Sequence, residues 1–123
     1  MSEKQLEHVA DEKIVEMQEE SERDDEIIYT LFVDGKIVSW AKTLLYSYLE
    51  EIHTARKKKR KGFGRKLLVY MEKNAKAHCA TTMRTSDIDP YDDEAISFFK
   101  SMRYELKPIL NGAKGSFEGT KII

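Results

Sequence analysis

The sequence has little of what would place it in a membrane or an oxidising compartment. It contains one cysteine, Cys79, so no internal disulfide can form. We expect this cysteine to be a buried small side chain at the end of a helix. No run of about 18 apolar residues occurs, and residues 1–13 lack the basic start and apolar middle of a signal peptide. We therefore expect a soluble, cytoplasmic protein.

Proline is also scarce, with two residues, and no internal repeat or low-complexity linker divides the chain. With 123 residues, of which 41% are hydrophobic, the chain can build one core but not two. We expect a single domain over residues 1–123, with an acidic N-terminal segment at residues 1–25.

The charges nearly cancel but are unevenly distributed. The 21 basic and 22 acidic residues give a net charge of -1. Eleven acidic and three basic residues lie from Glu3 to Glu26, whereas eight basic residues and no acidic residue lie from Arg56 to Lys66. Such a basic stretch creates a local positive field, which attracts an anionic ligand.

Residues 3–22 allow two interpretations. They are rich in helix-forming residues, and their apolar residues recur near one helical stripe, which predicts a helix. Val15 and Met17 also alternate with polar residues. A strand over residues 13–19 that turns back through residues 21–25 is therefore the alternative.

The rest of the chain alternates between strand and helix patterns. Residues 27–33 and 36–45 are rich in β-branched and aromatic residues and flank the turn dipeptide Asp34-Gly35, which predicts a β-hairpin. Asp92 can cap a helix, because its side chain can accept hydrogen bonds from the amides that follow it. The other predicted elements are a strand at residues 48–55, a helix at 65–78, a strand at 80–88, a helix after Asp92, and a terminal hairpin of residues 104–110 and 116–123.

The basic loop Lys59-Arg60-Lys61-Gly62-Phe63-Gly64 lies between a predicted strand and a predicted helix. Free amides at a helix N-terminus bind anions, and glycines let the backbone approach phosphate oxygens. The loop is neither a Walker loop nor a dinucleotide GxGxxG, since the residue three positions after Gly64 is Leu67. It predicts a different phosphate-binding site.

The loop resembles the signature of the GNAT superfamily of acetyltransferases, [Arg/Gln]-x-x-Gly-x-[Gly/Ala], with Lys59, Gly62 and Gly64 at the three defined positions. Residues 92–104 resemble the second helix of that family, and the resemblance covers about residues 26–123. It implies an α/β (α+β) fold: a mixed, mostly antiparallel central sheet with flanking helices. The strand, the basic glycine loop and the helix would form its cofactor-binding unit.

The resemblance implies an N-acetyltransferase that uses acetyl-coenzyme A as acyl donor, and we expect no metal ion. The backbone of one strand would pair with the pantetheine arm, and the loop amides would hold the pyrophosphate. Basic side chains of the loop would reach the 3′-phosphate. The implied cofactor-binding residues are Ile52, His53, Thr54, Lys59, Arg60, Lys61, Gly62, Phe63, Gly64, Arg65, Asp92, Phe98 and Phe99.

The resemblance also implies a general base near that strand, because the attacking ammonium must lose a proton. Glu50 and Glu51 should point to opposite faces, Glu51 sharing its face with Leu49 and His53. We expect Glu51 to be the base, with Glu50 and His53 as the other candidates. Phe99 stands where the family has a proton-donating tyrosine, so Tyr91 is the candidate acid.

Two other functions compete with the enzyme. A domain of this fold could bind acyl-coenzyme A without turnover, which the phenylalanine at position 99 suggests. A nucleic-acid patch at residues 56–66 is less favoured, because the N-terminal third is acidic and Phe63 is the one aromatic residue in the patch.

The amine acceptor is expected to be a peptide or protein amine or a polyamine. Only 26 residues precede the strand at residue 27, too few for the strand and two helices that usually form the acceptor pocket in the family. We therefore expect an open cleft, or one closed by a second subunit in a homodimer.

Overall fold

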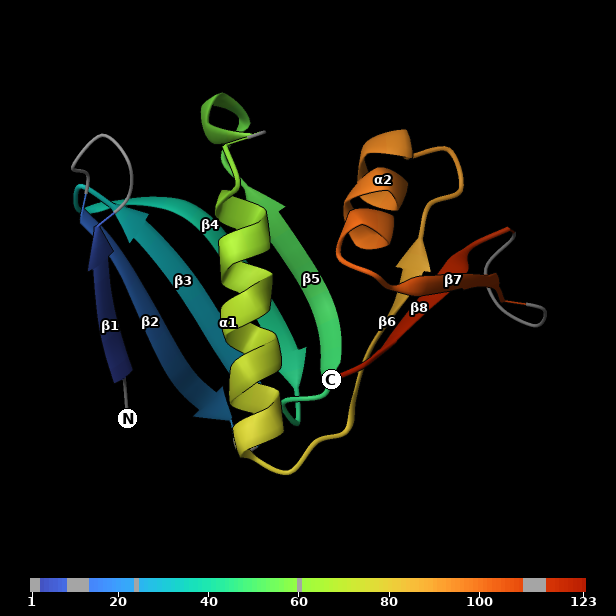
Figure 1. Cartoon of the computed structure of the whole chain (residues 1–123), viewed down its shortest axis with the longest axis horizontal. Helices are drawn as coiled ribbons and strands as arrows, with labels where there is room; N and C mark the ends of the chain where they lie inside the picture. Colours follow the sequence, from blue (N-terminus) through green and yellow to red (C-terminus); the bar gives the residue numbers. More distant parts are fainter. Residues whose placement is uncertain (1–2, 9–13, 24, 60, 110–114) are drawn as a thin grey trace.

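The computed structural model describes the chain except residues 1–2, 9–13, 24, 60 and 110–114 (Figure 1). The described residues form eight strands and two α-helices. The strands are β1 (Glu3–His8), β2 (Ile14–Arg23), β3 (Glu26–Val33), β4 (Lys36–Leu44), β5 (Tyr48–Thr54), β6 (Thr82–Ile88), β7 (Glu105–Pro108) and β8 (Phe117–Ile122). The helices are α1 (Phe63–Ala77) and α2 (Asp93–Ser101), and a short 3-10 helix, Arg56–Lys58, precedes α1.

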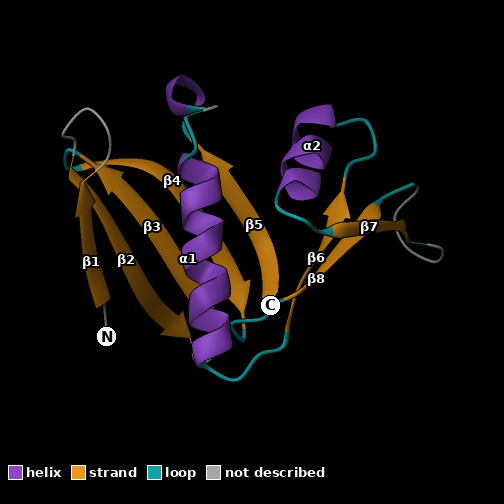
Figure 2. Ribbon diagram, in the orientation of Figure 1, coloured by secondary structure: helices purple, strands orange, loops and turns teal. Residues whose placement is uncertain are grey.

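All eight strands belong to one sheet, in the order β1-β2-β3-β4-β5-β6-β8-β7 (Figure 2). Neighbouring strands are antiparallel except β5 and β6, which run parallel. Helix α1 lies across β3, β4 and β5, and α2 contacts β7 (Figure 1). This confirms the predicted mixed, mostly antiparallel sheet with flanking helices. No helix in the described ranges has the length and apolar character needed to cross a membrane.

The hairpin of β3 and β4 follows its sequence pattern. Every second side chain of β3 is buried, and Asp34 and Gly35 both have positive φ, 52° and 76°. A two-residue turn with positive φ at both positions matches the right-handed twist of the strands that it joins. The predicted hairpin is therefore confirmed.

Helix α1 supplies much of the core. Leu67, Leu68, Met71 and Ala75 are fully buried, as their helical spacing predicts. They form one cluster with the buried side chains of β3 and β4, and each leucine contributes about 1.5–3 kcal/mol by leaving water. This packing fixes the N-terminus of α1 next to the end of β5.

The predicted helix at residues 3–22 is wrong, because the described residues of this range, 3–8 and 14–22, lie in β1 and β2. β2 pairs with β3 and places Met17, which is 4% exposed, beside Leu31. Pairing with an existing strand and burial on the α1 face outweigh the helix propensity of the Glu and Gln residues. The alternative strand was correct, although β2 extends farther than residues 13–19.

The ends of the helices differ in how well they were predicted. Asp92 caps α2 by accepting a hydrogen bond from the Ala95 amide at 3.0 Å, as predicted. Arg103 adopts φ 69° after α2, a left-handed conformation that glycine adopts more readily, at a cost of about 1 kcal/mol. Cys79 is exposed, not buried, because it takes φ 70° at the turn that follows α1.

Burial raises the pKa of the Tyr29 hydroxyl, and burial together with Glu72 raises the pKa of Tyr104. Above about pH 10 the unfolded chain loses these protons while the folded chain keeps them, so stability should fall as the pH rises. We expect this fall in denaturant titrations between about pH 9 and about pH 11, with a shallower slope for Tyr104→Phe. Equal slopes of stability against pH for the wild type and Tyr104→Phe would contradict the raised pKa of Tyr104.

Candidate functional site

β5 separates from its parallel neighbour after only two residue pairs, Tyr48 with Arg84 and Leu49 with Thr85. An irregularity in the pairing with β4 lies at the same level, because Lys42 pairs with Glu51 but Thr43 pairs with Leu49. Glu50 is the extra residue of this bulge, and bulges bend the strand that carries them. The C-terminal half of β5 therefore lies beside an opening in the sheet.

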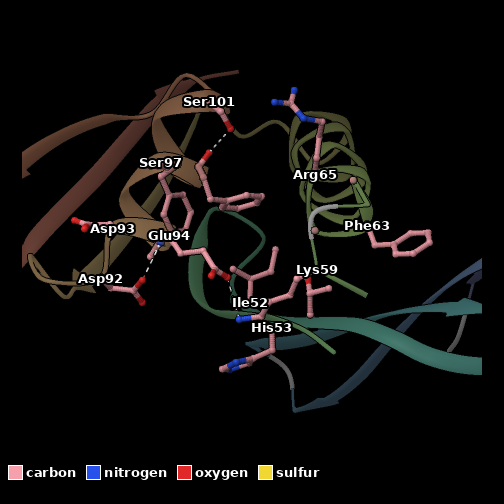
Figure 3. A pocket seen from close by; sticks show the side chains of 16 residues that line it. Ile52, His53, Lys59, Phe63, Arg65, Asp92, Asp93, Glu94, Ser97 and Ser101 are labelled. Carbon is pink, nitrogen blue, oxygen red and sulfur yellow. Dashed lines mark hydrogen bonds and ion pairs between the residues drawn. The ribbon is translucent and has the colours of Figure 1, made fainter. Parts of the chain in front are cut away.

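This opening leads into a groove of about 1080 Å³, a volume suited to a large ligand. Its walls are the end of β5, the loop before α1, the first turn of α1, and one face of α2 (Figure 3). All the predicted cofactor-binding residues line it except Lys61, which is exposed beside it, and Arg60, which lies outside the described residues.

The N-terminus of α1 is built to meet an anion. Gly62 precedes the helix with φ 83°, a conformation that favours glycine, and no side chain caps the first turn. The first turn also contains no acidic residue, and the first hydrogen bond within the helix runs from the Lys66 amide to the Gly62 carbonyl at 2.9 Å. The amides before Lys66 thus point toward the groove, with the positive end of the helix dipole.

Gly64 lies at a narrow point of the groove. A Cβ atom at this position would lie 3.1 Å from Thr54 Oγ1 and 3.5 Å from the Phe98 ring. A side chain at position 64 would therefore occupy the narrow space between Thr54 of β5 and Phe98 of α2, the Gly64 passage. Gly64 is therefore needed because a side chain would take up space in the groove. It is not needed for the geometry of a turn, since its φ is not in the left-handed region.

The free edge of β5 supplies backbone hydrogen-bonding groups. In an antiparallel pair, alternate residues turn their amide and carbonyl toward the partner strand. The Ala55 amide donates to the Val38 carbonyl at 2.7 Å, so residues 53 and 55 face β4. Ile52 and Thr54 consequently turn their backbone groups to the groove, whereas His53 does not.

Both basic and acidic side chains surround the groove. Lys59 and Arg65 line it, and Lys59 Nζ lies 3.0 Å from Glu94 Oε1, so that this ion pair joins the loop to α2 (Figure 3). Asp92 and Asp93 lie at the start of α2, where acidic side chains stabilise a helix. The basic loop is therefore partly balanced by acids across the groove.

One wall of the groove was not predicted from the sequence. Glu94, Ser97 and Ser101 line it together with Phe98. Their spacing of three and four residues places them on one face of α2, next to the buried face that carries Phe99. This helical spacing is the signal that would have found them.

Glu51 and His53 form a pair on β5, with His53 Nε2 3.0 Å from Glu51 Oε1. His53 borders the groove, and its ring points away from α2 (Figure 3). The predicted shared face of Glu51 and His53 is therefore confirmed. Leu49 does not share that face, because the bulge at Glu50 breaks the alternation and turns Leu49 into the core.

The candidate acid Tyr91 and the residue at the family's tyrosine position, Phe99, lie in opposite surroundings. Tyr91 is 91% exposed and does not line the groove, so the structure does not bring it to the site. Phe99 is 6% exposed and packs edge-on against Tyr104, with 5.4 Å between ring centroids. Among the described residues no tyrosine lines the groove; the hydroxyl groups there belong to Thr54, Ser97 and Ser101.

Residues 2–104 match the model of the acetyltransferase (GNAT) family. No curated protein sequence matches the chain. The PaiA N-acetyltransferase from Thermoplasma acidophilum, in complex with coenzyme A, has a similar structure, with a TM-score of 0.72 and 16% identity over 80% of this chain. The chain spans 62% of the length of that protein, less than two thirds.

Two other solved structures share the fold. The ribosomal-protein-S18-alanine N-acetyltransferase from Escherichia coli has a TM-score of 0.70 and 19% identity, over 83% of this chain and 72% of that one. A protein assigned as a streptothricin acetyltransferase from Bacillus anthracis, in complex with acetyl coenzyme A, has a TM-score of 0.67 and 14% identity, over 97% of this chain and 83% of that one.

Proposed function

The chain belongs to the GNAT family of acetyltransferases, and from this we propose that it transfers an acetyl group from acetyl-coenzyme A to a primary amine. The observation that carries the proposal is the passage at Gly64, which leads from the uncapped N-terminus of α1 to the free edge of β5. Such a path suits a long ligand with a phosphate at one end. The coenzyme A complexes of similar structures support this choice of ligand.

The chain's own groups fit the parts of this ligand. The first-turn amides of α1 and the nearby Lys59 and Arg65 would hold the pyrophosphate. The backbone of Ile52 and Thr54 would pair with the amides of the pantetheine arm, as an added strand does. Acetyl-coenzyme A would supply the thioester carbonyl that an amine can attack.

His53 and Glu51 are the proposed proton-accepting pair. Glu51 accepts a hydrogen bond from Nε2 of His53, which leaves the Nδ1 lone pair free to take a proton from the ammonium. Glu51 would fix this tautomer and stabilise the imidazolium that forms. In this proposal His53 would be the base and Glu51 the positioning residue, whereas Glu50 projects from the bulge as an exposed side chain.

Thiol release from acetyl-coenzyme A, measured against peptides, polyamines and aminoglycosides, tests the activity. We expect amine-dependent release, with a cofactor affinity that weakens as salt is raised, because the phosphate contacts are charged. His53→Gln should lower kcat by about 100-fold, the range of general-base catalysis. Release that does not depend on any amine would contradict the proposal.

Glu50→Gln and Glu51→Gln form a matched pair on adjacent positions of one strand. Glu51→Gln should lower kcat by about tenfold, because the imidazole loses its partner, while Glu50→Gln should keep the wild-type rate. The reverse result would assign the role of positioning residue to Glu50. Cofactor affinity, measured by calorimetry, should be the same in both variants.

A domain that binds acyl-coenzyme A without turnover is the second candidate. It is favoured by the absence of a tyrosine among the described residues that line the groove, where the buried Phe99 takes that position. Cofactor binding with no thiol release across the amine panel would select this function. The enzyme is preferred because a coenzyme A thiolate leaves readily near neutral pH without an acid.

A further inference from the structure

Four side chains of β4 and β5 occupy the sheet face opposite α1. Trp40 pairs with His53, and Lys42 pairs with Glu51, so these residues share one face. The intervening side chains of β4 are buried on the α1 side: Ser39, Ala41 and Thr43 are at most 1% exposed. The face with Trp40 is not covered to the same extent, since Trp40 is 36% exposed.

Trp40 lies directly against the proposed proton-accepting pair. Its ring centroid is 4.6 Å from that of His53, with 35° between the planes, and His53 is bonded to Glu51. An aromatic ring and a carboxylate thus both contact one imidazole that borders the groove. Neither a single exposed tryptophan nor a single surface ion pair would indicate a site, but the three groups converge beside the opening in the sheet.

We propose that Trp40, His53 and Glu51 form the acceptor subsite, and that it takes an aliphatic primary ammonium from the face opposite α1. The inference rests on the proposed function and names its substrate class. An ammonium is attracted to the face of an indole ring and to a carboxylate, and the methylenes next to it can pack on the same ring. An anionic acceptor would meet Glu51, and a neutral one would gain from neither contact.

The cation that is paired across the strands with Glu51 is partly balanced by another carboxylate. Lys42 is the cross-strand partner of Glu51, but its Nζ lies 3.8 Å from Glu26 Oε1. Its charge is therefore partly balanced on the side away from His53. The two substrates would also enter from different sides, the cofactor between α1 and α2 and the amine from the sheet face that carries Trp40.

Trp40 is the chain's one tryptophan, so its fluorescence reports on this subsite alone. The probes are 1,4-diaminobutane and the neutral 1,4-butanediol, titrated at low ionic strength into the full chain with coenzyme A present. We expect the diamine to change the emission saturably at about millimolar concentration, and the diol to leave it unchanged. Equal responses to the two probes would overturn the subsite.

Two variants separate binding from a structural role of the aromatic pair. Glu51→Gln keeps Trp40 and should weaken diamine binding about fivefold, whereas Ile37→Ala, a 56% exposed position on the same strand, should not. Trp40→Leu should raise the KM for the amine about fivefold and leave the KM for acetyl-coenzyme A unchanged. An unchanged KM for the amine, or equal changes in the KM for the amine and the KM for acetyl-coenzyme A, would show that Trp40 only stabilises the sheet.

The failure of the subsite and the failure of the enzyme give different results. Diamine binding without thiol release would keep the subsite and contradict the transfer activity. The opposite result is thiol release in a protein whose tryptophan emission does not respond to the diamine and whose Trp40→Leu variant has a wild-type KM for the amine. It would support the transfer activity and show that the acceptor binds elsewhere.

Discussion

Gly64→Val is expected to abolish coenzyme A binding while the domain stays folded. A Cβ atom alone would come within 3.1 Å of Thr54 Oγ1 and 3.5 Å of the Phe98 ring, so the two methyl groups of valine would fill the passage. The backbone at this position is helical, where valine has a higher intrinsic propensity than glycine, so the strain of the substitution is confined to the contacts with Thr54 and Phe98. We expect at least a 100-fold loss of affinity, because a bulky group would occupy the path of the ligand.

Gly62→Ala is the matched control for this variant. Gly62 is two residues away in the same loop, but a Cβ atom there would meet no atom within 4 Å. Its φ of 83° makes alanine cost about 1 kcal/mol in stability, without filling the groove. Calorimetry with coenzyme A and thermal melting separate the two effects: Gly64→Val should lose binding and Gly62→Ala mainly stability. A folded Gly64→Val protein with near wild-type affinity would show that the ligand does not pass between Thr54 and Phe98.

The elements around this passage were predictable because local patterns and tertiary packing agree there. The alternation of β3 and the dipeptide Asp34-Gly35 predicted the hairpin, and the apolar spacing of α1 predicted the buried helix. The strand, loop and helix arrangement around the basic residues was predictable for a similar reason. Its glycines and basic residues lie in a short segment, between a strand and a helix that are themselves clear in the sequence.

The remaining features depend on contacts between distant residues. β2 is a strand because it pairs with β3, and its polar composition shows this only weakly. The predicted face of Leu49 was wrong because a bulge at Glu50 inserts one residue into β5. A prediction that assumes strict alternation along the strand does not allow for such an extra residue. The contact of Trp40 with His53 follows from the register of β4 and β5, which could not be predicted from the sequence alone.

The largest loss of stability is expected for Glu72→Ala. Glu72 on α1 is 8% exposed and accepts hydrogen bonds from the Tyr104 hydroxyl at 2.7 Å and from Lys121 Nζ at 2.8 Å. Its removal leaves a buried hydroxyl and a mostly buried ammonium without their acceptor. Breaking such a pair from one side costs about 3 kcal/mol, which lowers the Tm of a domain of this size by about 10 °C.

The three residues of this network tie α1 to the part of the chain that carries α2. Tyr104 follows α2, and Lys121 lies on β8, so Glu72 holds together the two walls of the groove. We therefore expect Glu72→Ala to weaken coenzyme A binding as well, although Glu72 does not line the groove. Loss of stability with unchanged affinity would contradict this coupling.

The controls for Glu72→Ala lie on the same helix and in the same network. Lys73→Ala removes an exposed neighbour on α1 and should change stability by less than about 0.5 kcal/mol. Glu72→Leu combined with Lys121→Met removes both charges and replaces them with apolar groups of similar size. Since exchanging a whole buried pair is often neutral, this double variant should recover most of the stability that Glu72→Ala loses. A double variant as unstable as Glu72→Ala would show that the carboxylate stabilises the fold through the Tyr104 hydroxyl rather than through its pairing with Lys121.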